Sequence, residues 1–141
     1  TMLHAIEIFM NRTGKQLTHV VLLQPTSPFR TGKDIDNAIE IFESSNCSTL
    51  ASVSPGVKKR DNVLKRKIDD LHCCDLIKSD VPYEYIRYNA AIYIVSCEYL
   101  LCNNLFKDDF QVFYEMSELN SIDVDTELDL EITDLLMKNR L

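Results

Sequence analysis

The chain has 141 residues, of which 45% are apolar and 26% charged, a composition typical of one soluble globular domain. No apolar run approaches the roughly 18 residues that a membrane span needs, and only 3 Gly and 4 Pro exclude collagen-like and low-complexity chains. The formal net charge of −7 disfavours binding to a nucleic-acid backbone. The 5 Cys form no C-x-x-C pair and no signal segment opens the chain, so we expect reduced thiols and a cytoplasmic protein.

The first part of the chain alternates between helical and strand patterns. Apolar residues at helical spacing predict a helix over residues 2–10. The branched run at residues 20–23 is apolar at every position, which is typical of a parallel strand buried on both faces. Thr31 and Asp34 match a capping box, and the apolar residues that follow predict a helix ending near residues 44–46.

The same alternation continues through much of the chain. Residues 49–53 have the pattern of a second strand, so helix, strand, helix and strand follow one another and predict an α/β fold with a largely parallel sheet. Further along, residues 90–95 and 112–116 predict strands, and residues 98–101 begin a short helix. Thr126, with Asp129 three residues on, caps the last helix.

The alternation is interrupted over residues 57–86. Six of the 15 basic residues gather within ten positions there, with little apolar periodicity to bury them. They are Lys58, Lys59, Arg60, Lys65, Arg66 and Lys67. We therefore expect a single domain over residues 1–141, from which the segment at about 57–86 projects as an inserted lobe. Nucleic-acid binding by this cluster is disfavoured because no aromatic residues are interleaved with it.

Two polar segments lie where loops meet predicted strands, the place at which open α/β sheets bind ligands. In the first, two prolines stiffen residues 24–30, where Gln24 can contact a base or sugar and Arg30 a phosphate or carboxylate. The alternative is a proline-rich turn whose Ser and Thr cap their own backbone. In the second, Arg87 and Asn89 could bind a carboxylate, although Arg87 could instead pair with surface acids.

A third polar segment carries two carboxylates. In an extended chain, residues two apart point to the same side, so Asp123 and Asp125 would present their side chains together. Paired carboxylates repel each other unless a cation lies between them, and Mg²⁺ takes few carboxylates together with water and substrate phosphates. The alternative is that these acids only cap the helix that follows.

Three sequence runs together resemble a known family. They are residues 21–30, residues 89–94 and residues 121–130. In order and spacing, over nearly the whole chain, they resemble the acylneuraminate cytidylyltransferases, also called CMP-sialic acid synthetases. The resemblance implies a three-layer, Rossmann-like nucleotidyltransferase fold with a mostly parallel sheet. It also implies that CTP and a nine-carbon 2-keto acid sugar react, with Mg²⁺, to give a CMP-sugar and pyrophosphate.

The resemblance also assigns roles to individual residues. Asp123 and Asp125 correspond to the metal-binding aspartates, and with Arg87 they form the catalytic set. The other positions that it places around the substrates are Gln24, Thr26, Ser27, Arg30, Asn89, Tyr93 and Phe106. The lobe at about 57–86 falls where the family carries a dimerisation lobe, so the resemblance implies a homodimer, with no nucleic acid and no membrane as partner.

The sequence departs from the family pattern at three places. The usual Asn-Gly-Ala is Asn89-Ala90-Ala91, which removes the freedom of a Gly at that turn, and Lys78 stands where the lobe often has Arg. The family opens with a Gly-rich loop that holds the CTP triphosphate, whereas the 3 Gly here form no run. We therefore expect the C-terminal part of a synthetase, truncated at the N-terminus. The alternative is a catalytically incompetent fragment or degenerate homologue that binds sugar or only dimerises.

Overall fold

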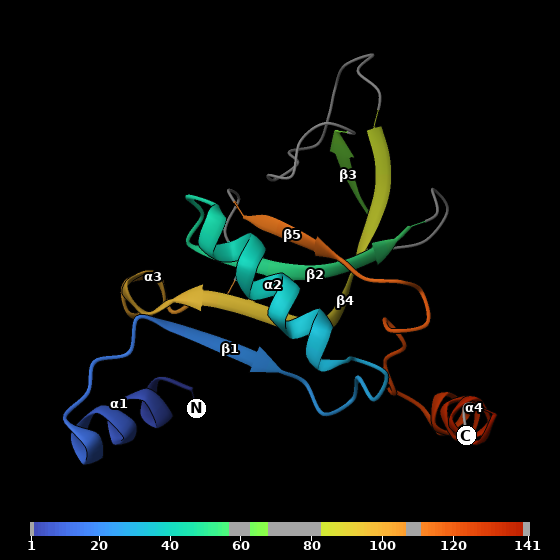
Figure 1. Ribbon diagram of the computed structural model, residues 1–141, viewed down its shortest axis with the longest axis horizontal. Helices are drawn as coiled ribbons and strands as arrows, with labels where there is room; N and C mark the ends of the chain where they lie inside the picture. Colours follow the sequence, from blue (N-terminus) through green and yellow to red (C-terminus); the bar gives the residue numbers. More distant parts are fainter. Residues whose placement is uncertain (1, 57–62, 68–82, 107–110, 140–141) are drawn as a thin grey trace.

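The computed structural model describes residues 2–56, 63–67, 83–106 and 111–139, which form a five-stranded mixed sheet with helices packed against it (Figure 1). In chain order the elements are α1 (Met2–Thr13), β1 (His19–Leu23), α2 (Gly32–Ser44), β2 (Thr49–Pro55), β3 (Val63–Lys67), β4 (Tyr83–Ser96), α3 (Cys97–Asn103), β5 (Val112–Glu115) and α4 (Glu127–Lys138). None of the helices in these ranges is long and apolar enough to cross a bilayer.

The long strand β4 organises the sheet. It runs antiparallel to β1, to β2 and to β3, whereas β2 and β5 are parallel, and the strand order is β1-β4-β2-β5. The predicted α/β fold is confirmed, and β1, β2 and β5 share one direction as expected. The expectation of mostly parallel pairing needs a correction, because β4 lies between β1 and β2 and runs against both.

The path of the chain between β2 and β4 explains this correction. A parallel return to a sheet needs a crossover, usually a helix, whereas an antiparallel return does not. The described part of the 57–86 segment contains β3, which pairs with β4 in the register Lys67↔Tyr83, and the chain therefore returns in the opposite direction. As a result β4 starts at Tyr83, well before the strand predicted at 90–95. Lys78 and most of the predicted dimerisation lobe lie outside the described residues.

The core consists of apolar layers on both faces of the sheet. The helix α2 lies over one face (Figure 1). Its residues Ala38 and Phe42 pack against Leu50 of β2 and Ile94 of β4, and all four are buried. The Thr31–Asp34 capping box that begins α2 is present as predicted.

The other face is covered by α1 and α3. Val95 points to the opposite side from its neighbour Ile94, and it packs with Ile6 of α1 and Leu100 of α3. Fully burying side chains of this size contributes about 1.5–3 kcal/mol each. The three layers predicted from the resemblance are therefore present.

The strand β1 differs from its prediction as a strand buried on both faces. Its residues alternate between exposed and half-buried, and Val21 and Leu23 are each 37% exposed. Within the described ranges β1 pairs with β4 alone, so it lies at the edge of this sheet. An apolar run at residues 20–23 cannot distinguish a central strand from an edge strand, because the pairing partners lie far away in the sequence.

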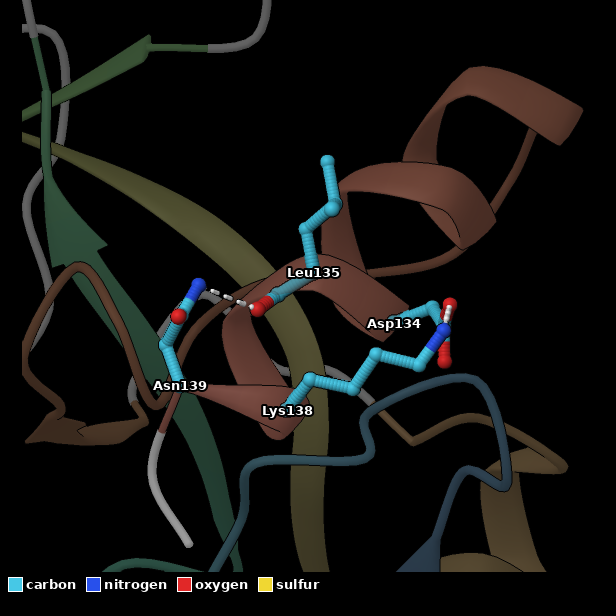
Figure 2. A network of polar contacts seen from close by, with 4 residues as sticks. All are labelled: Asp134, Leu135, Lys138 and Asn139. Atoms are coloured by element: carbon cyan, nitrogen blue, oxygen red, sulfur yellow. Dashed lines mark hydrogen bonds and ion pairs between the residues drawn. The ribbon is translucent and has the colours of Figure 1, made fainter.

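The last helix, α4, stands apart from the sheet (Figure 1). The predicted capping box of Thr126 and Asp129 is present at its start. At its other end, Figure 2 shows that Lys138 pairs with Asp134 and that the Asn139 side chain donates to the Leu135 carbonyl oxygen at 2.8 Å. Such exposed contacts stabilise a helix only slightly. Five large apolar side chains of α4 are between 40% and 64% exposed: Leu128, Leu130, Ile132, Leu135 and Met137.

Candidate active site

A cleft of about 430 Å³ lies between β4 and the segment that precedes α4. Residues 87–90 of β4 form one wall. The other wall comes from Glu118, Ser121, Ile122, Asp123 and Asp125, together with Asp129 and Ile132 of α4. The cleft brings together four of the residues that the sequence predicts for the site, although they come from two runs more than 30 positions apart: Arg87, Asn89, Asp123 and Asp125.

The segment that carries the two aspartates has no regular secondary structure, and both aspartates line the cleft as the spacing predicts. Asp123 is half-buried, and its Oδ1 is a buried oxygen with no hydrogen-bond partner among the described residues. Asp125 is exposed. Burial raises the pKa of Tyr93, and the negative charge of Asp123 raises it further.

The guanidinium of Arg87 is oriented by the neighbouring strand. Its Nε donates to Ser54 Oγ at 3.0 Å, and the side chain is half-buried in the wall of the cleft. The planar guanidinium offers further N–H donors beyond Nε, and these suit the two oxygens of a carboxylate. Four acidic residues line the same cleft, so carboxylate binding by Arg87 and its alternative, pairing with nearby acids, both stay predictions.

The predicted substrate residue Asn89 is buried and already engaged. Its Oδ1 accepts hydrogen bonds from Ser52 Oγ at 2.5 Å and from the Ala91 amide at 3.2 Å. Its Nδ2 donates to Ser121 Oγ at 2.8 Å. Ser52 Oγ in turn accepts from the Ile92 amide at 2.7 Å. Asn89 therefore connects β4 and β2 to the segment before Asp123. The second hydrogen on its Nδ2 is not used in these bonds.

The residue after Asn89 has a left-handed backbone. Ala90 lines the cleft with φ of +59°, in the region that favours Gly. The family pattern has Gly at this position, and Gly adopts a left-handed backbone more easily than Ala does. The backbone at Ala90 is therefore strained in this chain.

The loop after β1 supports the cleft from behind. The Arg30 guanidinium donates to the carbonyl oxygens of Gln24 at 2.9 Å and Ala91 at 2.8 Å. The backbone carbonyl oxygen of Thr26 accepts from the Val124 amide at 2.9 Å. These contacts join the loop to β4 and to the segment that carries the two aspartates. Residues 24–30 themselves are not among the lining residues. Ser27 and Thr26 carry buried hydroxyl oxygens without a hydrogen-bond partner in the described part of the chain. Their predicted substrate contacts stay predictions.

The predicted pocket walls Tyr93 and Phe106 lie one layer away from the cleft. Both belong to the apolar cluster that also contains Tyr88 and Ala90, which do line it. Their contact with an acylated sugar stays a prediction.

Sequence reasoning did not single out three polar lining residues, namely Glu118, Ser121 and Asp129. Asp129 was recognised as a helix cap, and that role is confirmed. Its Oδ2 accepts from the Thr126 hydroxyl and amide and from the Asp125 amide, and these hydrogen bonds lower its pKa. Ser121 begins the third run, residues 121–130, without having been given a role, and nothing in the local pattern marks Glu118 as a cleft residue.

The carboxylates that line the cleft are candidate ligands for a divalent cation. No group of three or more His, Cys, Asp or Glu side chains within the described ranges is arranged to hold a metal ion. Two aspartates and an unpartnered buried oxygen on Asp123 nevertheless suit Mg²⁺, which takes few protein carboxylates and completes its shell with water and phosphates. Asp123 and Asp125 would therefore hold Mg²⁺ only with water or phosphate oxygens completing its shell.

Several proteins are similar to this chain, although no family model matches it. The CMP-N,N'-diacetyllegionaminic acid synthase of Legionella pneumophila is 30% identical over 130 residues, 84% of this chain and 53% of that protein. The N-acylneuraminate cytidylyltransferase of Streptococcus agalactiae serotype V is 31% identical over 75% of this chain and 27% of that protein. That of Escherichia coli O18:K1:H7 is 27% identical over 97% of this chain and 33% of that protein.

The fold has a counterpart among solved structures. A CMP:2-keto-3-deoxy-manno-octonic acid synthetase complexed with CTP matches with a TM-score of 0.70 and 14% identity, over 97% of this chain and 67% of that one. The chain therefore has the nucleotidyltransferase fold. Within that class it is a homologue of the acylneuraminate cytidylyltransferases, which confirms the resemblance predicted from its three runs. It spans about half the length of the legionaminic acid relative and about a third or less of the other two.

Proposed function

We propose that this chain carries the sugar-binding and cation-binding side of a cytidylyltransferase that joins an acidic nine-carbon 2-keto sugar to CMP from CTP. The observation that supports the proposal most is that Arg87, Asp123 and Asp125 converge on one cleft. The homology to acylneuraminate cytidylyltransferases supplies the class of reaction, and the residues in the cleft supply groups suited to it.

The charge of the cleft supports the need for a cation. Its lining carries four carboxylates, from Glu118, Asp123, Asp125 and Asp129, and the single guanidinium of Arg87. Both proposed substrates are anions, and two like charges 4 Å apart repel each other by about 4 kcal/mol near a protein surface. A divalent ion held by Asp123 and Asp125 would offset this repulsion by supplying positive charge. The same acids that would repel CTP alone therefore suit CTP that carries Mg²⁺.

The proposed mechanism assigns a task to each of these side chains. Arg87 binds the sugar carboxylate through its guanidinium, while Ser54 holds Nε and fixes the plane of the group. Asp123 and Asp125 would hold Mg²⁺, which when bound neutralises charge on the phosphates. The oxygen of the sugar's anomeric hydroxyl forms a bond to the α-phosphorus and loses its proton to solvent. The bond between that phosphorus and the oxygen that bridges it to the β-phosphorus breaks, and pyrophosphate leaves. Positioning and electrostatic stabilisation supply most of the acceleration.

A binding experiment with Mn²⁺ as the probe for Mg²⁺ tests the carboxylates. We expect Asp123→Asn to weaken Mn²⁺ binding to the chain at least tenfold, measured by electron paramagnetic resonance of the free ion. Asp134→Asn is the matched control, since Asp134 is exposed on α4 and pairs with Lys138. Equal Mn²⁺ affinities for the Asp123 variant and the unaltered chain would contradict the cation role.

A second measurement separates the enzyme from its main alternative, a sugar-binding module without catalysis. We expect Arg87→Gln to weaken calorimetric binding of N-acetylneuraminic acid, whereas Arg12→Gln on the exposed end of α1 leaves it unchanged. If Arg87→Gln weakens sugar binding but Asp123→Asn does not weaken Mn²⁺ binding, the sugar-binding module is favoured over the enzyme. If Arg87→Gln leaves sugar binding unchanged and Asp123→Asn leaves Mn²⁺ binding unchanged, both functions are refuted for this cleft.

A further inference from the structure

The position of Asp123 and Asp125 depends on a segment that lacks regular structure. After β5 the chain makes a turn at Ser117–Ser121 and then runs without helix or strand until α4 begins. Such a segment needs contacts with rigid elements if its carboxylates are to keep one position. One contact is the backbone hydrogen bond from Val124 to Thr26. Two further contacts come from side chains within the turn.

The first side-chain contact ties the turn to the start of α2. Asn120 Nδ2 donates to Asp34 Oδ2 at 3.0 Å, and Tyr114 donates to the other oxygen of Asp34 at 3.0 Å. Asp34 is only 7% exposed, and the Thr31 cap donates to it as well. Burial raises the pKa of Asp34, but the hydrogen bonds from Thr31, Tyr114 and Asn120 outweigh burial and lower it. The carboxylate is therefore a fixed acceptor at the end of a rigid helix.

The second side-chain contact ties the turn to the centre of the sheet. Ser121 Oγ accepts from Asn89 Nδ2 at 2.8 Å and donates to the Ser117 carbonyl oxygen at 2.7 Å. Asn89 is held in turn by Ser52 of β2, and all three side chains, Asn89, Ser121 and Ser52, are buried. This contact lies two residues before Asp123, so the chain between them spans at most about 7 Å.

We propose that Asn120 and Ser121 are positioning residues that hold the Asp123–Asp125 segment in place by anchoring it to α2 and β4. The inference rests on the proposed function in that it takes Asp123 as the cation ligand. Asp123 Oδ1 is buried without a partner among the described residues, which is an unfavourable place for a carboxylate oxygen. The two anchors, one to α2 and one to β4, keep it there, and without them the segment would relax until this oxygen reached water.

Amide hydrogen exchange on the ¹⁵N-labelled chain tests the anchoring without any metal. We expect Ser121→Ala and Asn120→Ala, made separately, each to speed exchange of the Val124 amide at least tenfold, because its bond to Thr26 opens more often. Amides in the centre of β4, such as Ile94, should change much less. Ser121→Thr keeps the hydroxyl and should restore slow exchange, and Ser44→Ala, at an exposed serine of α2, is the matched control.

Mn²⁺ affinity provides the functional measurement. We expect Ser121→Ala to weaken Mn²⁺ binding at least fivefold in protein that remains folded, and Ser121→Thr to recover it. An unchanged exchange rate of the Val124 amide would overturn the proposal. So would a rise no larger than that of the Ile94 amide, because the two side chains would then support the whole fold and not this segment. If Val124 responds as expected but the unaltered chain binds no Mn²⁺, the positioning stands and the proposed cation site fails.

Discussion

The left-handed residue in the cleft leads to a prediction about stability. Ala90 has φ of +59°, and this conformation costs an L-residue with a Cβ about 1–2 kcal/mol. Ala90→Gly removes that cost. Ala91→Gly is the matched comparison, because Ala91 is fully buried and is not among the residues with positive φ.

The magnitude follows from comparing the two variants. Each substitution adds the same backbone freedom to the unfolded chain, about 0.4–1 kcal/mol, so this contribution cancels in the difference. Ala91→Gly loses a fully buried methyl group, about 0.8 kcal/mol, whereas half-buried Ala90 loses roughly half as much. Together with the conformational cost released at Ala90, we expect Ala90→Gly to be more stable than Ala91→Gly by about 2 kcal/mol.

Thermal and urea unfolding followed by far-ultraviolet circular dichroism measure this difference. For a chain of this length, about 2 kcal/mol corresponds to roughly 6 °C in Tm. We expect Ala90→Gly to unfold at or slightly above the temperature of the unaltered chain, and Ala91→Gly clearly below it. Equal midpoints for the two variants would refute the reasoning, because they would mean that the backbone at Ala90 stores no strain.

Three further predictions concern side chains around the cleft. Because its folded pKa is lowered, Asp34 contributes stability above its ordinary pKa of 3.8 that is lost as the pH falls, so Asp34→Asn should flatten the loss of Tm below about pH 4. Arg30→Met should lower stability by about 2 kcal/mol in urea unfolding, because the carbonyls of Gln24 and Ala91 lose a charged donor. Ser27→Ala should change Tm by no more than about 1–2 °C, because its buried hydroxyl has no partner in the described residues, and a larger loss would reveal a bond.

Local signals in the sequence predicted much of the fold. The capping boxes at Thr31 and Thr126 each lie within four residues, and both helices begin where these signals place them. The direction of β4 could not be obtained in this way, because it depends on how the chain returns from the 57–86 segment. The available sign was the low apolar periodicity of that segment, because a parallel return to the sheet usually passes through a helix with a periodic apolar face.

Only part of the candidate site could be predicted, because its contacts also join positions that are far apart in the sequence. Arg87 and Asp123 were chosen from motifs, and the structure places both in one cleft. The role of Asn89 was harder to predict, since a buried amide in a strand can face a ligand or its own protein, and here it bonds Ser52 and Ser121. Hydrogen bonds between positions more than 30 residues apart leave no periodic signal in a single sequence.

The arrangement of strands around β4 also has a consequence for the rate and order of folding. The β3–β4 pairs join residues as close as Lys67 and Tyr83, whereas the β1–β4 pairs join residues about 70 or more positions apart, such as Leu23 and Ile92. Closing the longer loop costs about 1.3 kcal/mol more entropy, so β1 should dock late. The loop after β1 carries Thr26, which holds the aspartate segment through Val124. We therefore expect the cleft to be completed in the last step of folding and to be the first part lost in partial unfolding.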